Sequence, residues 1–209
     1  MPPYIYFELV SFLASITLYF QKGTPRYMKT LPVFLFMIVV VEILGWKWVK
    51  GQANIWLYNF FIVIQFEYYL YILRNFIYKE KAKKVILYII LAYPILSLAN
   101  IFFGQNYQFN SITYALGCLL VVSACVYYFY ELFRLPKSVN LIREHAFWIT
   151  TALLFFHCCT FAHFSLLNFL LQGSPALYRR LGAILLVMLF LFYLLITIGV
   201  LCRIIIRKR

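Results

Sequence analysis

The chain contains no aspartate, and six glutamates are the only acids among its 209 residues. Intramembrane proteases and hydrolases that work with paired aspartates are therefore excluded. Charge is scarce too, because charged residues make up 12% of the chain and hydrophobic residues 65%. A soluble domain of this size needs a charged surface that this composition does not supply.

The patterns of two well-known classes of seven-helix protein are also missing. The last apolar stretch, Leu181–Ile206, has no lysine, which a retinal protein needs in its last helix. The Asp-Arg-Tyr and Asn-Pro-x-x-Tyr patterns of eukaryotic receptors do not occur. Any likeness to those receptors is therefore one of topology, which says little about function.

Metal-binding and catalytic groupings are lacking as well. The five cysteines fall within apolar stretches without Cys-x-x-Cys spacing, so we expect no disulfide framework, no metal site and no cofactor. His157 and His163 lie six residues apart, which turns them roughly 120° from each other on a helix. Helix-borne metal sites place histidines three or four residues apart with carboxylates nearby. Because no serine or cysteine has a nucleophile context, we expect no catalytic residue and no enzyme.

Long apolar stretches, by contrast, fill the chain. A helix crosses the hydrocarbon core with about 20 apolar residues, and stretches of this kind predict an all-α protein with seven transmembrane helices. The connections are short, so we expect a single domain, residues 1–209, and no soluble domain. The predicted helices are Tyr4–Phe20, Leu31–Trp46, Ile55–Tyr78, Val85–Gly104, Ser111–Leu132, Ala146–Leu171 and Leu181–Ile206.

Basic residues indicate how these helices are oriented. With the N-terminus outside, fifteen lysines and arginines fall on the inner side and four on the outer side. The positive-inside rule therefore predicts an N-out, C-in multi-pass membrane protein. The basic loops fit anionic lipid headgroups rather than nucleic acid. The densest cluster, which we expect to dock an acidic cytoplasmic partner, consists of Lys79, Lys81, Lys83 and Lys84.

The third helix carries polar residues at membrane depth. Asn59, Glu67 and Tyr71 follow one another at steps of four or eight and therefore share a flank of the helix. A charged carboxylate at the bilayer centre costs at least about 2.5 kcal/mol. We therefore expect Glu67 to face the bundle interior, with His157 and Tyr93 as candidate partners at similar depth.

A second group of polar residues falls in the outer halves of the predicted helices. If the helices close into a bundle, this group would form an outward-facing pocket for a small or lipidic ligand. Hydrogen bonds that merely hold helices together, worth about 0.6 to 2 kcal/mol each, explain the same residues. Both interpretations stay open for Glu8, Glu42, Asn59, Asn100, Thr113, His163 and Asn168.

Three aromatic blocks resemble a known family. "NIWLYNFFIVIQFEYYLYIL", "YYFYELF" and "AFWITTALLFF" are similar to a family of small seven-helix membrane proteins common in Bacteroidota-type bacteria. The resemblance runs over nearly the whole chain and implies the seven-helix fold and a place in the bacterial inner membrane. Family members encoded near histidine-kinase genes imply a sensory role, but no catalytic residue carries over. The polar positions inside the matching blocks are Tyr58, Asn59, Glu67, Tyr130 and Glu131.

These observations favour a sensor or signalling component with an outward ligand pocket and a basic cytoplasmic face. Its expected partners are the lipid bilayer and a cytoplasmic or membrane signalling protein, with a second copy of the chain as a further candidate, and no nucleic acid. The alternative is a small transporter or oligomeric channel subunit that handles protons or ions through Glu67 and His157. An intramembrane lipid enzyme is a third interpretation, which the missing aspartates disfavour.

Overall fold

The computed structural model describes residues 2–105, 108–134, 140–165 and 175–206, and the secondary structure in these ranges is entirely helical. Seven of the helices there are long and apolar enough to cross a membrane, which indicates a multi-pass membrane protein and confirms the all-α prediction. They are α1 (Pro3–Phe20), α2 (Leu31–Lys47), α3 (Gln52–Phe76), α4 (Glu80–Ala99), α5 (Ser111–Leu132), α6 (His145–Ser165) and α8 (Pro175–Ile206). Short 3-10 helices, η1 (Arg26–Thr30) and η3 (Leu141–Arg143), precede α2 and α6, and a π-helical turn, η2 (Asn100–Gly104), continues α4.

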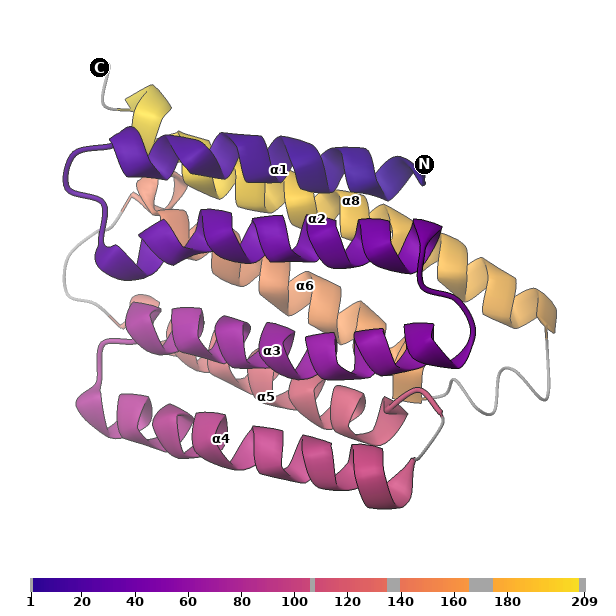
Figure 1. The fold of residues 1–209 in the computed structure, drawn as a ribbon. Coiled ribbons are helices and arrows are strands. Elements are labelled where there is room, and N and C mark those ends of the chain that lie inside the picture. Colours follow the sequence, from indigo (N-terminus) through magenta and orange to yellow (C-terminus); the bar gives the residue numbers. More distant parts are fainter. Residues whose placement is uncertain (1, 106–107, 135–139, 166–174, 207–209) are drawn as a thin grey trace.

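The helices lie side by side along a common direction (Figure 1). α1 packs against α2 and α8, α3 packs against α2, α4 and α5, and α6 contacts α3, α5 and α8. The first residues of α1 and the last residues of α8 lie at opposite ends of the bundle (Figure 1). We call the end that holds the start of α1 and the α2–α3 connection the amino end. The opposite end, which holds the α3–α4 connection, is the lysine end.

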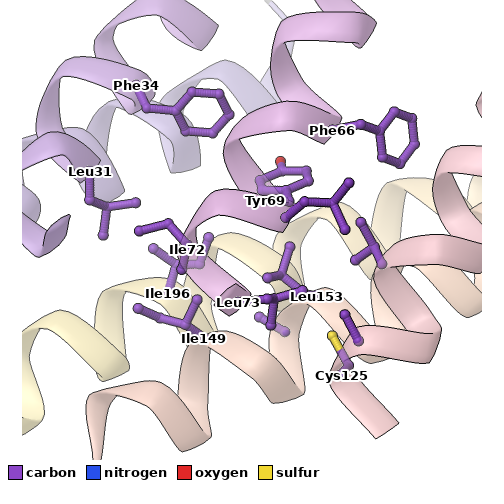
Figure 2. Packing of buried hydrophobic residues seen from close by; sticks show 14 of the residues in the cluster. Leu31, Phe34, Phe66, Tyr69, Ile72, Leu73, Cys125, Ile149, Leu153 and Ile196 are labelled. Atoms are coloured by element: carbon purple, nitrogen blue, oxygen red, sulfur yellow. The ribbon is translucent and has the colours of Figure 1, made fainter. Parts of the chain in front are cut away.

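An apolar core joins α2, α3, α5, α6 and α8 (Figure 2). Gly117 of α5 allows part of this packing, because an added Cβ there would lie 2.7 Å from the ring of Phe66 on α3. The outward faces expose large apolar side chains such as Leu91 and Ile95 of α4, as contact with lipid requires. Labelled core residues in Figure 2 are Leu31, Phe34, Phe66, Tyr69, Ile72, Leu73, Cys125, Ile149, Leu153 and Ile196.

A buried glutamate fixes the α3–α4 connection. Glu131 of α5 accepts hydrogen bonds from the backbone amides of Tyr78, at 2.7 Å, and Lys79, at 3.1 Å. The first amides of a helix have no partner within the helix, and here a neighbouring helix supplies a carboxylate to two amides at the start of α4. Glu131 thus holds α4 against the rest of the bundle.

Candidate functional site

A pocket of about 340 Å³ opens near the amino end of the bundle. Its walls come from α1, α2, α3, α6 and α8, with contributions from Phe109 and Tyr114 around the start of α5. We call it the amino-end pocket. Its polar residues are Tyr4, Glu8, Glu42, Tyr58, Gln65, Tyr114, Thr160 and Tyr193. Its apolar walls include Ile38, Phe61, Ile62, Phe109, Phe156, Phe164 and Leu189.

Glu42 of α2 is held by two tyrosines from different helices. The Tyr58 hydroxyl of α3 donates to Glu42 Oε2 at 3.0 Å, and the Tyr4 hydroxyl of α1 donates to the same oxygen at 3.3 Å. One carboxylate therefore links α1, α2 and α3 at the amino end. Because both phenolic hydrogens point at Glu42, these hydroxyls offer mainly acceptor lone pairs to a molecule in the pocket.

Gly45 makes this arrangement possible. It lies three residues after Glu42 on α2, and a Cβ added there would lie 2.6 Å from the hydroxyl oxygen of Tyr58. No side chain fits between α2 and the tyrosine ring at that distance. The missing side chain thus lets Tyr58 reach Glu42.

Glu8 of α1 is the most buried acid in the pocket, with 2% of its surface exposed. The Tyr193 side chain of α8 lies close to its carboxyl group and lines the same pocket. Its Oε2 atom is buried and has no hydrogen-bond partner among the described residues. A buried polar atom without a partner destabilises the fold unless something else satisfies it.

Ser11 places Glu8 against α8. The Ser11 hydroxyl donates to the backbone carbonyl of Tyr193 at 2.9 Å and lies 2.8 Å from the Thr197 hydroxyl. Ser11 follows Glu8 by three residues and therefore lies on the same face of α1. This contact keeps Glu8 beside Tyr193.

Gln65 lines the pocket and contacts a residue of the apolar core. Its Nε2 donates to the Tyr69 hydroxyl at 2.8 Å, and the Tyr69 ring lies edge-on to the ring of His157, 5.2 Å between centroids. His157 is buried, with Nδ1 2.8 Å from the backbone carbonyl of Leu153. This is the environment of a packing histidine, one layer below the pocket.

The chemistry of the pocket follows from these side chains. Two carboxyl groups and several hydroxyls lie among aromatic and aliphatic walls, and none of its described lining residues is a lysine, arginine or histidine. The described residues contain no group of three or more histidines, cysteines and acids that could hold a metal ion. The pocket can therefore bind a molecule with an apolar body and a polar, donor-bearing group.

The polar residues that we predicted to form an outward-facing pocket have two kinds of position in the structure. Glu8 and Glu42 line the amino-end pocket together, whereas Asn59 has a structural position. Asn59 donates to the backbone carbonyl of Gln108 at 2.8 Å and accepts from the backbone amide of Asn110 at 3.0 Å. It thus fixes the segment before α5, where Asn100 also bonds to Asn110.

Thr113 and His163 are buried, and neither is among the residues that line the pocket. Thr113 contributes its backbone carbonyl, which accepts from the Tyr93 hydroxyl at 3.1 Å. Asn168 lies outside the described residues.

The predicted polar flank of α3 turns gradually outward. Asn59 is buried, Glu67 is half-buried, and Tyr71 is exposed. Glu67 lies close enough to Tyr93 of α4 for an electrostatic interaction, while its Oε1 has no hydrogen-bond partner among the described residues. His157, the other expected partner of Glu67, contacts the rings of Phe66 and Tyr69 on α3. The two expected partners of Glu67, Tyr93 and His157, therefore have different surroundings.

The basic cluster lies at the lysine end. Lys79, Lys81 and Lys84 are exposed, and the Lys83 ammonium pairs with Glu80 at 2.7 Å. The adjacent Tyr130 ring stacks under the Arg134 guanidinium, 4.2 Å from the ring centroid. Three lysines therefore stay available to a partner or to lipid headgroups.

Sequence reasoning marked Tyr58 as a polar position of a matching block, but it missed Tyr4, Gln65 and Tyr193. Tyrosines in membrane helices are usually assigned to the interfacial belt. Helical spacing could have found two of the missed residues. Tyr4 and Glu8 are four residues apart on α1, and Tyr58 and Gln65 are seven apart on α3. Both spacings place side chains on a common face.

Comparison with protein-family profiles, with curated proteins and with solved structures gave no match to this chain.

Proposed function

We propose that this chain is a sensor or signalling component of the bacterial inner membrane that binds a small or lipidic ligand in the amino-end pocket. One observation carries the proposal. Glu8 is buried in the wall of a pocket large enough for a small molecule, and one of its carboxyl oxygens has no partner among the described residues. A bound molecule would supply that partner.

The pocket also offers a way to report occupancy. Glu8, Glu42 and Tyr58 belong to α1, α2 and α3, so a ligand that touches them favours one arrangement of these helices over another. α3 runs from the pocket to the lysine end, where it ends beside the turn that Glu131 holds. The exposed lysines that follow are the proposed docking surface for a partner.

The charge asymmetry supports the proposed orientation, with the amino end outside. The pocket then opens toward the outer half of the bilayer, and the lysine end meets the cytoplasm. Ligands from the outer leaflet or from outside the membrane would have access.

The alternative, a transporter or channel subunit, depends on Glu67 and His157 acting together. Glu67 lies near Tyr93 of α4, whereas His157 packs on Phe66 and Tyr69. The sensor proposal is favoured because the residues on which it depends share one pocket.

Filling the pocket tests the proposal. A Cβ added at Gly182 of α8, which lines the pocket, meets no atom within 4 Å, so Gly182→Trp places its ring in or at the pocket. Ile184→Trp is the matched control, because Ile184 is exposed and lies outside the pocket lining. Native mass spectrometry of the chain purified from bacterial membranes should detect a bound small molecule or lipid in the wild type and control, and lose it in Gly182→Trp.

A second measurement tests the signalling part of the proposal. Backbone hydrogen exchange at residues 77–84 should differ between the wild type and Gly182→Trp, and agree between the wild type and Ile184→Trp. Identical bound masses and identical exchange in all three proteins would contradict the proposal.

A further inference from the structure

The two acids that line the amino-end pocket point to a ligand class. We propose that the pocket recognises an organic cation, a molecule with an ammonium group on an apolar body. This inference rests on the proposed ligand-binding function and specifies the chemistry of that same site.

None of the described residues gives the acids of the pocket a cationic partner. Among the described residues the single salt bridge joins Lys83 to Glu80, at the lysine end. Glu8 and Glu42 lie close enough to interact electrostatically, at the other end of the bundle. Buried carboxylates normally have a positive partner or several hydrogen-bond donors. A bound cation stabilises the ionised form of both carboxyl groups, whereas an anion does not.

The hydrogen-bonding groups of the pocket also favour a cation as its ligand. The hydroxyl hydrogens of Tyr4 and Tyr58 are already directed at Glu42, and Glu8 Oε2 has no donor among the residues that the structure describes. The pocket thus has unused acceptors close to its acids. An ammonium group carries only donors, so it complements these atoms.

The rest of the pocket suits the body of such a molecule. Phe61, Phe156 and Phe164 line it together with aliphatic residues, and aromatic faces attract cations as well as apolar groups. A volume of about 340 Å³ has room for a small molecule rather than for a bare ion.

Three probes of equal size test the charge requirement. Phenethylammonium, 2-phenylethanol and phenylacetate share a benzyl body and differ in the charge of the terminal group. Isothermal titration of the full-length protein in detergent at neutral pH should give binding for phenethylammonium, and at least about tenfold weaker binding for the alcohol and the acid.

Two variants test the acids. Glu8→Gln should weaken phenethylammonium binding at least about tenfold, because the amide keeps the shape and loses the charge. Glu80→Gln is the control and should bind as the wild type does, because Glu80 is exposed at the lysine end. Circular dichroism verifies folding, and Glu42→Gln takes the place of Glu8→Gln if that variant does not fold.

The source of the ammonium group is decided by competition. If a lipid headgroup is the natural ligand, nanodiscs of phosphatidylethanolamine should weaken phenethylammonium binding relative to nanodiscs of phosphatidylglycerol. Equal binding in both nanodiscs assigns the site to a free amine. Either result supports a cation site.

Other outcomes overturn the inference. If the alcohol binds as tightly as the ammonium, or the variants at both acids bind normally, charge is not what the pocket recognises. If the binding seen in either case is lost in Gly182→Trp, the pocket is still a ligand site, but for another class of ligand. If no probe binds, the cation class is wrong, and the native mass spectra then decide separately whether the pocket holds a ligand.

Discussion

Gly45 sets how closely Tyr58 approaches α2, and through Tyr58 it helps to position Glu42. Gly45→Ala should destabilise the protein by about 1–3 kcal/mol, because the new Cβ would lie 2.6 Å from the Tyr58 hydroxyl and the ring would have to move. Thermal unfolding in detergent, followed by circular dichroism, measures the change.

The control for this prediction is Gly182→Ala. Its Cβ meets no atom within 4 Å, so the replacement should be neutral or stabilising by up to about 1 kcal/mol, as helix propensity favours alanine. Adding Tyr58→Phe to Gly45→Ala removes the nearest atom and should recover part of the loss. Equal stability of Gly45→Ala and the wild type would show that Tyr58 does not need the space.

At the residue scale, the sequence predicted the acids of the candidate site better than it predicted the residues that contact these acids. Glu8 and Glu42 could be selected because carboxylates are rare and costly in membrane helices. Tyr193 lies 185 residues after Glu8 in the chain, and no local pattern links the two. Asn59 carried the same polar signal as Glu42, yet it fixes a backbone segment, because an amide can donate and accept at once.

At the scale of single elements, the start of α4 depends on α5. Replacing Glu131 by glutamine should destabilise the protein by about 1.5–3 kcal/mol, because one of the two amides at Tyr78 and Lys79 loses a charged acceptor. Chemical unfolding in detergent measures this, with Glu80→Gln as a control. The Glu80 side chain is 77% exposed, so solvent screens its salt bridge and its replacement should change stability much less. Equal effects of the two replacements would contradict the role of Glu131.

The cysteines test how α5 and α6 pack. Cys158 of α6 is exposed on the apolar surface, whereas Cys118 and Cys125 of α5 are buried. N-ethylmaleimide should therefore label Cys158 in the folded protein, and a charged maleimide applied to intact cells should label it poorly. Cys118 and Cys125 should react only after denaturation.

Mass spectrometry of labelled peptides, with Cys158→Ser as a control, separates these sites. Rapid reaction of Cys158 with the charged reagent would reveal water along α6 and would favour the transporter alternative.

Helix bounds were largely predictable because hydropathy determines them. The predicted stretch Ser111–Leu132 is α5, since Asn110 precedes it and apolar residues fill it. α3 begins at Gln52, three residues before the predicted Ile55, because polar residues continue its first turn. Hydropathy does not report such turns, nor does it say which face of a helix meets which neighbour. The amino-end pocket depends on those faces.

For the whole molecule, the orientation in the membrane is the main prediction. The excess of basic residues at one end predicts that reporter fusions after Lys84 and after Arg209 are cytoplasmic, and that a fusion after Gln108 is external. Alkaline phosphatase, active only outside the cytoplasm, and green fluorescent protein give complementary signals. A cytoplasmic signal at Gln108 would contradict the seven-helix topology.

The bond from Glu131 to the start of α4 has a consequence for biosynthesis. The amide of Tyr78 leaves the ribosome 53 residues before its acceptor. At about 5–20 residues per second, the delay is on the order of 3–10 seconds. During that interval water or lipid headgroups must satisfy the amides of Tyr78 and Lys79. The α3–α4 connection is therefore made before its acceptor exists, and this bond can form only after α5 has been synthesised.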